Sequence, residues 1–248
     1  MDLPRQHTIR EGDLRICNPF TPEKLATLGE VIKLRAGDTL LDLASGRGEM
    51  LCTWARDHGV SGTGVDISTV ATDRARRRAA ELGVADRVEF RHGDAGEYVA
   101  DTPVDVAACI GATWIGDGVP GTLALLERSL RPGGMLLVGE PFWRREPPSR
   151  EAVEACHAQS RDDWRDLPGL VSLFRESGWD LVEMILADQD SWDRYAAAHW
   201  LNIRRWLDAN PDDELAPAFR AELVRDPLDY VRYRREYLGW GVFALLRS

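Results

Sequence analysis

The sequence predicts an α/β domain built on a doubly wound, mostly parallel sheet. Apolar runs of strand length and segments of helical period alternate from about residue 22 to residue 140, which is typical of a parallel sheet with helices on both faces. A turn containing two glycines joins the first strand to the helix that follows it. The chain has 248 residues with 44% hydrophobic content, which is enough to bury one sizeable core.

The elements of this sheet follow one another through short connections. Thr21 and Pro22 begin a helix, because threonine caps a helix start and proline fits the first turn. Ser68 caps a later helix, and Gly83 follows its last turn. The predicted strands cover 39–43, 63–67, 87–92, 104–110 and 135–140, and the helices between them cover 50–58, 68–82 and 123–130.

The pattern changes after residue 140. A stretch rich in proline and arginine, 141–148, precedes helices near 149–160 and at 167–177, a strand at 181–186, a helical insertion at 190–236 and an apolar strand at 241–246. We therefore expect an N-terminal lid segment, 1–21, an α/β domain, 22–189 with 237–248, and an inserted helical cap, 190–236. His7, Asn18 and Phe20 lie in the segment that we expect to fold over the binding site.

The composition limits which kinds of partner the protein can bind. The net charge is −10, whereas a protein that binds DNA or RNA needs a positive face to replace the phosphate counterions, so we expect no nucleic-acid partner. No stretch approaches the roughly 18–20 apolar residues of a membrane span, and no apolar run follows the first charges, which predicts a cytoplasmic protein without a membrane partner. The cysteines lie far apart with no C-x-x-C pair, so we expect no metal.

The turn after the first strand indicates what the domain binds. Asp42 lies inside the strand just before the turn, and Gly46 and Gly48 allow the backbone to approach a ligand closely. A dinucleotide fingerprint needs a third glycine where Leu51 stands, and Glu49 would repel a pyrophosphate at the helix start. A buried carboxylate at position 42 instead suits a cationic ligand.

Further acidic residues end the next two strands. Asp66 ends the second strand, where a carboxylate can accept hydrogen bonds from both ribose hydroxyls. Asp94 ends the third strand, where it can accept a hydrogen bond from an adenine amino group. Ile110 and Gly111 end the fourth strand on the floor of the same cleft. Together these positions predict a site for an adenosine-containing cation.

These residues resemble those of class I S-adenosylmethionine-dependent methyltransferases over about residues 22 to 140 and the final strand. The acidic glycine-rich loop of that family matches 42–48, with Ala44 in place of its first glycine, and its Pro-Gly-Gly turn matches 132–134. The resemblance implies a Rossmann-like sheet of seven strands with the last antiparallel, and S-adenosyl-L-methionine as the cofactor. More narrowly, the chain is similar to an uncharacterised bacterial subfamily of small-molecule methyltransferases. The implied cofactor-binding residues are Asp42, Ala44, Gly46, Gly48, Asp66, Ile67, Asp94, Ala95, Ile110 and Gly111.

The segments after the fourth and fifth strands are candidates for the substrate site. Trp114 follows the fourth strand in a loop that lacks the Asn/Asp-Pro-Pro-Tyr/Phe motif of the amino-group methylases of DNA and glutamine. Glu140 ends the fifth strand and is a candidate base or cation-binding group; a salt bridge to Arg144 or Arg145 is the alternative. Trp143 lies in the same segment and is a candidate substrate contact.

One face of the insertion carries aromatic and polar side chains. Trp192, Tyr195 and His199 recur at helical spacing, and Asn202 and Trp206 continue the stripe, which suits a cap over a pocket. His199 is the candidate general base, because the pKa of histidine lies near neutrality; packing alone is the alternative. The candidate catalytic residues are therefore His199, Glu140 and Tyr195, and the candidate substrate-binding residues are Trp114, Trp143, Trp192, Tyr195 and His199.

The sequence therefore predicts a methyltransferase that acts on a small metabolite, as a monomer or a homodimer. The acceptor atom can be oxygen, nitrogen, sulfur or carbon. An enzyme that cyclises or cleaves S-adenosylmethionine itself is an alternative, because the same site suits it. A non-catalytic cofactor-binding protein is a further alternative.

Overall fold

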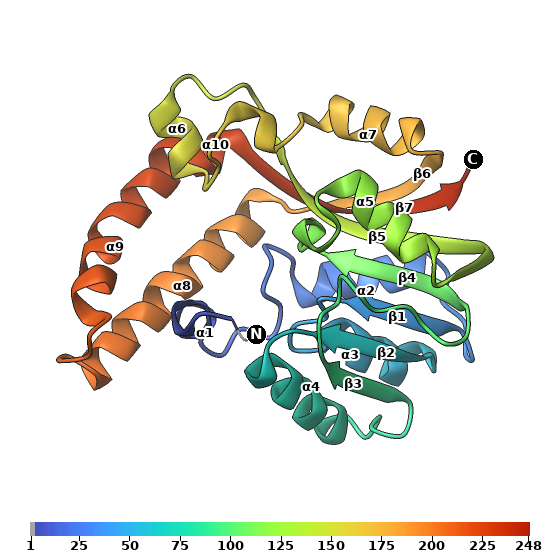
Figure 1. Cartoon of the computed structure of the whole chain (residues 1–248). Coiled ribbons are helices and arrows are strands. Elements are labelled where there is room, and N and C mark those ends of the chain that lie inside the picture. Colours follow the sequence, from blue (N-terminus) through green and yellow to red (C-terminus); the bar gives the residue numbers. More distant parts are fainter. Residues whose placement is uncertain (1–2) are drawn as a thin grey trace.

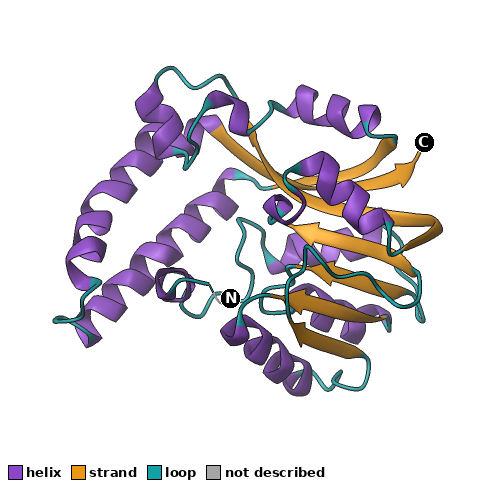
Figure 2. Cartoon of the chain, viewed as in Figure 1, coloured by secondary structure: helices purple, strands orange, loops and turns teal. Residues whose placement is uncertain are grey.

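A seven-stranded sheet with helices on both faces forms the body of the protein in a computed structural model that describes residues 3–248 (Figures 1 and 2). The strand order is β3-β2-β1-β4-β5-β7-β6, and β7 is antiparallel to both of its neighbours. The predicted sheet of seven strands with an antiparallel last strand is confirmed. The strands are β1 Thr39–Leu43, β2 Ser61–Asp66, β3 Val88–His92, β4 Val104–Ile110, β5 Leu130–Trp143, β6 Trp179–Leu186 and β7 Leu238–Arg247.

Two apolar layers hold helices against the two faces of this sheet. Leu40 of β1 faces the layer shared with α2, α3 and α4, and Leu41 faces the layer shared with α5 and α7. Because side chains alternate along a strand, Asp42 points to the same face as Leu40. The helices are α1 Arg5–Glu11, α2 Pro22–Val31, α3 Glu49–His58, α4 Thr69–Glu81, α5 Val119–Glu127, α6 Arg150–Ala155, α7 Leu167–Glu176, α8 Gln189–Ala209, α9 Ala216–Asp229 and α10 Arg235–Tyr237.

The helix starts inferred from the sequence have the expected local structure. The Thr21 hydroxyl accepts a hydrogen bond from the backbone N–H of Lys24 at 3.2 Å, and Pro22 is the first residue of α2. The Ser68 hydroxyl accepts one from the N–H of Ala71 at 3.2 Å at the start of α4. These bonds satisfy N–H groups that have no partner within the helix.

Several elements differ from their predicted bounds, and the largest shifts of a single end are in β5 and α6. β5 begins at Leu130, five residues before the predicted start, because the Pro-Gly-Gly stretch forms a bulge within the strand and Gly133 takes a φ of 76°. α6 ends at Ala155, well short of residue 160, since His157 has a left-handed φ of 64°. Helical periodicity does not report a left-handed residue of this kind, so the predicted helix was too long.

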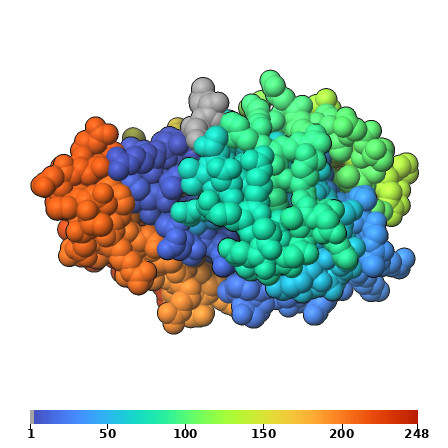
Figure 3. All heavy atoms as spheres, turned by 90° about the horizontal axis from the view of Figure 1, so that it is seen from below, coloured from blue at the N-terminus to red at the C-terminus, as the bar shows by residue number. Residues whose placement is uncertain are grey.

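The insertion extends away from the sheet and meets the N-terminal segment. A separate apolar cluster joins Ile9 of α1 to Ile203 of α8 and Phe219 of α9. Figure 3 shows the N-terminal residues in blue between the orange helices of the insertion and the cyan-green part of the sheet domain. Residues 1 and 2 of the predicted lid lie outside the described residues. The N-terminal segment therefore connects the insertion with the α/β domain.

Candidate cofactor and substrate site

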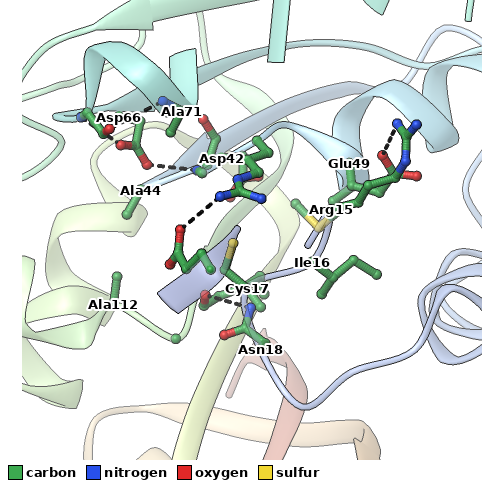
Figure 4. A pocket seen from close by; sticks show the side chains of 18 of the residues that line it. Arg15, Ile16, Cys17, Asn18, Asp42, Ala44, Glu49, Asp66, Ala71 and Ala112 are labelled. Atoms are coloured by element: carbon green, nitrogen blue, oxygen red, sulfur yellow. Dashed lines mark hydrogen bonds and ion pairs between the residues drawn. The ribbon is translucent and has the colours of Figure 1, made fainter. Parts of the chain in front are cut away.

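A cavity lies at the carboxyl edge of the parallel strands, where ligands of open α/β sheets bind. Its wall comes from the loop after β1, the ends of β2 and β4, the first turn of α4, and the segment that precedes α2 (Figure 4). Seven of the predicted site residues line it: Asp42, Ala44, Gly46, Asp66, Ile110, Gly111 and Trp114. His7, Asn18 and Phe20 of the expected lid line it as well.

The loop after β1 turns through left-handed backbone at alternate residues. Ala44 has a φ of 60°, Gly46 of 53° and Gly48 of 69°. Ala44 therefore adopts the conformation for which a glycine is the usual residue. Gly48 is not in the cavity wall; a Cβ there would lie 2.4 Å from Cζ of Phe90, so close packing with that ring requires a glycine. Its predicted contact with the cofactor stays a prediction.

Asp66 is held rigidly by the loop. Its Oδ2 accepts a hydrogen bond from the backbone N–H of Gly46 at 2.7 Å, and its Oδ1 accepts one from the N–H of Ser68 at 2.8 Å (Figure 4). Each carboxylate oxygen can accept a second hydrogen bond. The side chain is therefore fixed in the wall of the cavity, at the position where we expected the ribose-binding acid.

Asp42 has an unsatisfied carboxyl oxygen inside the protein. Its side chain is buried, and Oδ1 has no hydrogen-bond partner among the described residues. Burial, with the nearby carboxylate of Asp66 as a second cause, raises the pKa of Asp42 well above its ordinary value. An unpaired polar atom of this kind costs stability, so it is explained by a cationic ligand that completes its contacts.

The N-terminal segment supplies parts of the wall that sequence patterns did not reveal. Arg47, inside the glycine loop, donates a hydrogen bond to the Leu14 carbonyl and approaches Glu11 at 3.4 Å. Asn18, which we expected in the lid, donates to the carbonyl of Ile110 at 3.4 Å. Arg47 carried a local signal, because an arginine between two glycines is an unusual charge to place at a tight turn. Glu11 and Cys17 also line the cavity; both belong to the expected lid, 1–21, but no pattern singled them out individually.

Three predicted cofactor residues lie beside the cavity and do not line it. Asp94 is exposed, and its Oδ1 accepts a hydrogen bond from the N–H of Gly96 at 2.8 Å within its own turn. Ala95 is buried in the layer under α5, and the carbonyl of Ile67 lies 2.9 Å from the His92 ring. Asp94 and Ala95 follow β3, one strand beyond the wall, and Ile67 directly follows Asp66 at the end of β2. Their contact with the cofactor stays a prediction.

The two predicted substrate-binding tryptophans outside the insertion lie in different surroundings. Trp114 is 72% exposed and stands at the rim of the cavity. Trp143 is buried away from the cavity: its indole N–H donates to the carbonyl of Arg161 at 2.8 Å, and its ring lies 4.9 Å from that of Trp164. A structural role explains Trp143, because its polar atom and its ring both have partners within the fold.

Glu140 does not face the cavity either. Its neighbour Gly139 pairs with Ile110 on the cavity side of the sheet, so the alternation of side chains turns Glu140 to the opposite face. There it accepts a hydrogen bond from the Thr113 hydroxyl at 2.7 Å. The alternative of a salt bridge is wrong, since Arg145 pairs with Glu236 and Arg144 contacts Gln189. Burial raises the pKa of Glu140 to about 7.

The aromatic stripe of α8 lies against the back of the N-terminal segment. The Tyr195 hydroxyl donates to the carbonyl of Cys17 at 3.0 Å, and the Tyr195 ring lies 6.4 Å from Trp192 and 4.5 Å from His199. Trp192 Nε1 and His199 Nε2 are buried and have no partner among residues 3–248. None of the three lines the cofactor cavity, but Cys17, whose carbonyl accepts from Tyr195, does line it.

The geometry of the cavity defines a class of protein. An α/β sheet carries, at its carboxyl edge, one carboxylate suited to a ribose and a second suited to a cation. Within the described chain no helix is long and apolar enough to cross a membrane. The two carboxylates at the sheet edge are the features of a domain that binds a cationic adenosine derivative.

Known proteins agree with this assignment. The family model described as a methyltransferase domain matches residues 40–134. Two crystal structures described as S-adenosylmethionine-dependent methyltransferases in complex with S-adenosyl-L-homocysteine, from Thiobacillus denitrificans and Geobacter sulfurreducens, are each 60% identical with a TM-score of 0.98. They cover all of this chain, which in turn covers 100% and 99% of them. The uncharacterised protein YjhP of Escherichia coli is 58% identical over 246 residues, 99% of both chains.

The chain therefore belongs to the S-adenosylmethionine-dependent methyltransferases. This confirms the predicted family, enzyme class, Rossmann-like fold and cofactor. The roles of individual site residues, and the division into domain, lid and cap, remain predictions.

Proposed function

We propose that this enzyme transfers the methyl group of S-adenosylmethionine to a small, partly apolar metabolite that binds between α8 and the N-terminal segment. The proposed binding of S-adenosylmethionine is supported by the buried, unpaired Oδ1 of Asp42, which lies near the carboxylate of Asp66. The cofactor supplies an electrophilic methyl group and carries its own positive charge. The residues of the chain have to bind, orient and exclude water.

The proposed binding of the methyl acceptor is supported by the aromatic and polar face of α8, which carries Trp192, Tyr195 and His199. Trp192 offers an indole N–H donor, and His199 offers an unpaired ring nitrogen two turns further along the same face. Burial lowers the pKa of His199 to about 4, so the ring is neutral at pH 7 and can accept a hydrogen bond. Buried polar atoms without partners are costly, so these two favour a substrate that carries oxygen or nitrogen at matching positions on an apolar frame.

Orientation is the main contribution that these residues can make to the rate. Holding nucleophile and electrophile in line supplies about 7–11 kcal/mol in favourable cases. A histidine with a pKa of about 4 is a weak base at neutral pH, and Glu140 faces the other side of the sheet. We therefore propose His199 as a positioning residue and hydrogen-bond acceptor, with Tyr195 fixing the N-terminal segment through Cys17.

The first test is calorimetric titration of S-adenosylhomocysteine into the intact chain and into Asp66→Ala. We expect micromolar binding by the intact chain and a loss of at least tenfold in the variant, because charge-assisted hydrogen bonds contribute about 1.5–3 kcal/mol each. Asp86→Ala is the matched control, since Asp86 is exposed in the turn before β3. Equal affinity of the Asp66 and Asp86 variants would contradict the assignment of the ribose site.

The second test finds the acceptor. Small molecules from a cell extract are incubated with the enzyme and a cofactor labelled in its methyl group, and labelled products are separated and identified. His199→Phe and Trp192→Phe keep the ring volume and remove the polar atom, so we expect them to lower turnover while cofactor affinity is retained. Turnover unchanged in both variants would place the acceptor site elsewhere.

A further inference from the structure

Two histidines near the insertion have ring nitrogens without hydrogen-bond partners. One is His199 of α8, whose Nε2 is buried. The other is His157, which follows α6 and whose ring has no hydrogen-bond partner among residues 3–248. Its backbone has a left-handed φ of 64°, a conformation for which glycine is the usual residue. Side chains kept in such a conformation concentrate at ligand sites, so His157 is a candidate ligand contact.

A chain of hydrogen bonds connects the segments that carry these two rings. On α8, the Trp200 indole donates to Asp226 at 2.7 Å, and Arg234 donates to the same carboxylate at 2.6 Å. Arg234 also donates to the carbonyl of Ala155, the last residue of α6, at 3.0 Å. In Figure 1, α6 lies beside the end of α9 that leads into α10. Because Trp200 and Ala155 lie one and two residues from the two histidines, this chain holds the histidines in the same part of the molecule.

The two rings also share their charged surroundings. Burial is the largest cause that lowers the pKa of each ring, to about 4. The guanidiniums of Arg10 and Arg234 lower the pKa of both rings as well, and the carboxylates of Asp226 and Glu222 oppose them. Solvent still reaches the His157 side chain. A side chain that solvent reaches although protein surrounds it lines a recess, so the two rings border a recess between α1, α6, α8 and α9.

The charges around this recess compensate one another. Arg10 pairs with Glu222 at 2.7 Å, and Arg234 pairs with Asp226 at 2.6 Å. Both rings are neutral at pH 7, because the pKa of each is about 4. An ionised group that entered the recess would lose its hydration, and the four charges beside it are already paired. The recess therefore suits an uncharged part of a ligand.

A hydroxyl group matches a pair of neutral imidazoles. Each neutral imidazole has one N–H donor and one acceptor nitrogen. A hydroxyl can donate its proton to the acceptor nitrogen of one ring while its oxygen accepts from the N–H of the other. A metal ion is a poorer match, because no group of three or more His, Cys, Asp or Glu side chains among residues 3–248 is placed to hold one.

We propose that His157 and His199 together bind a hydroxyl group on an uncharged part of the methyl acceptor, which makes the substrate an alcohol or a phenol. The proposal rests on the methyl-transfer site proposed above and adds His157 to it as a specificity-determining residue. Neither histidine is in the wall of the cofactor cavity, so this hydroxyl is recognised at a distance from the transferred methyl group.

The test compares three ligands that share a fluorinated ring and differ in the polar group. 4-Fluorobenzyl alcohol is uncharged at pH 7, 4-fluorobenzoate is an anion, and 4-fluorobenzylamine is a cation. Each is titrated into the intact chain saturated with S-adenosylhomocysteine, and binding is followed by fluorine NMR. We expect the alcohol to bind about tenfold more tightly than either ion, because the ions lose hydration without a partner. Tighter binding of either ion, or no detectable binding of the alcohol, overturns the proposal.

Two variants at position 157 locate the bound alcohol. His157→Phe keeps a ring and removes its nitrogens, and His157→Gly removes the ring and fits the left-handed backbone, so that it serves where the first variant does not fold. Each is expected to weaken the alcohol about 3- to 10-fold, the range of one uncharged hydrogen bond, with unchanged calorimetric affinity for S-adenosylhomocysteine. His58→Phe is the matched control, since His58 ends α3 on the sheet domain, and it is expected to leave the alcohol unaffected. Unchanged affinity for the alcohol in the His157 variants overturns the proposal.

The substrate found with labelled cofactor gives an independent readout. For that substrate, His157→Gly is expected to raise KM about 3- to 10-fold and to change kcat by less than about twofold, because the lost contact is distant from the methyl group. An unchanged KM overturns the proposal. The absence of any labelled product would refute methyl transfer itself, whereas the titration of the three fluorinated ligands still decides whether the recess binds a hydroxyl.

Discussion

Replacing Glu140 by glutamine should stabilise the protein, and by an amount that grows with pH. The Glu140 carboxyl is buried on the α5 side of the sheet, and it accepts a hydrogen bond from the Thr113 hydroxyl. Burial raises its pKa from 4.5 to about 7. Glutamine has nearly the same shape, keeps an oxygen that accepts from Thr113, and cannot ionise.

The size of the stabilisation by Glu140→Gln follows from the pKa shift of Glu140. Between pH 4.5 and pH 7 the folded chain holds a proton on Glu140 that the unfolded chain has released, so the free energy of unfolding falls as the pH rises through this window. A shift of this size corresponds to about 3 kcal/mol once the pH exceeds 7. Glu140→Gln avoids the loss, and for a chain of this length the gain at pH 8 corresponds to a rise in Tm of about 6–12 °C.

The assay is thermal unfolding followed by circular dichroism, in half-unit steps of pH from 5 to 8.5. We expect the Tm difference between Glu140→Gln and the intact chain to widen across this range and to level off near pH 8. Glu176→Gln, at an exposed position, should show no pH-dependent difference. A Glu140→Gln chain that is less stable at pH 8, or a difference that does not change with pH, would refute the reasoning.

Three other outcomes follow from the same structure. Asp42→Asn should raise the Tm at pH 7, because it removes a buried carboxyl with a raised pKa, and should weaken S-adenosylhomocysteine in calorimetry; unchanged affinity would count against its role. Gly48→Ala should cost about 1–3 kcal/mol more in urea unfolding than Gly83→Ala, since both have positive φ but only position 48 lacks room for a Cβ; equal costs would exclude the packing argument. A double-mutant cycle of Arg10→Ala and Glu222→Ala should give a coupling of about 1 kcal/mol, from bonds of 2.7 and 2.8 Å between α1 and α9, and additive effects would show that the pair contributes nothing.

The local structure of this protein could be predicted from its sequence. Strand β1 and its glycine turn follow from a short apolar run that contains Asp42, and the starts of α2 and α4 follow from Thr21 and Ser68. Each of these features depends on neighbours within about four residues, which a sequence displays directly. The family resemblance added the order and direction of the strands, which periodicity alone does not determine.

The parts that were missed depend on contacts between distant residues. Arg47 meets Glu11 across 36 positions, and Tyr195 meets Cys17 across 178, so no local pattern indicates that they share a site. Glu140 was expected at the cleft because it follows β5's apolar core, but a shift of one residue in a strand reverses the face of a side chain. Trp143 likewise found partners in the segment around Arg161, which the sequence pattern did not connect with it.

The position of β7 affects the order in which the protein can be made. β7 follows every other helix and strand along the chain, yet it lies between β5 and β6, with eight of its ten residues buried. During synthesis on the ribosome, one edge of β5 therefore stays unpaired, and β6 has no neighbouring strand, until β7 has been made, about 100 residues after β5. An exposed, apolar strand edge is prone to aggregation in that interval, so slow translation upstream of β7 should lower the yield of soluble enzyme, and chaperones that cover strand edges should restore it.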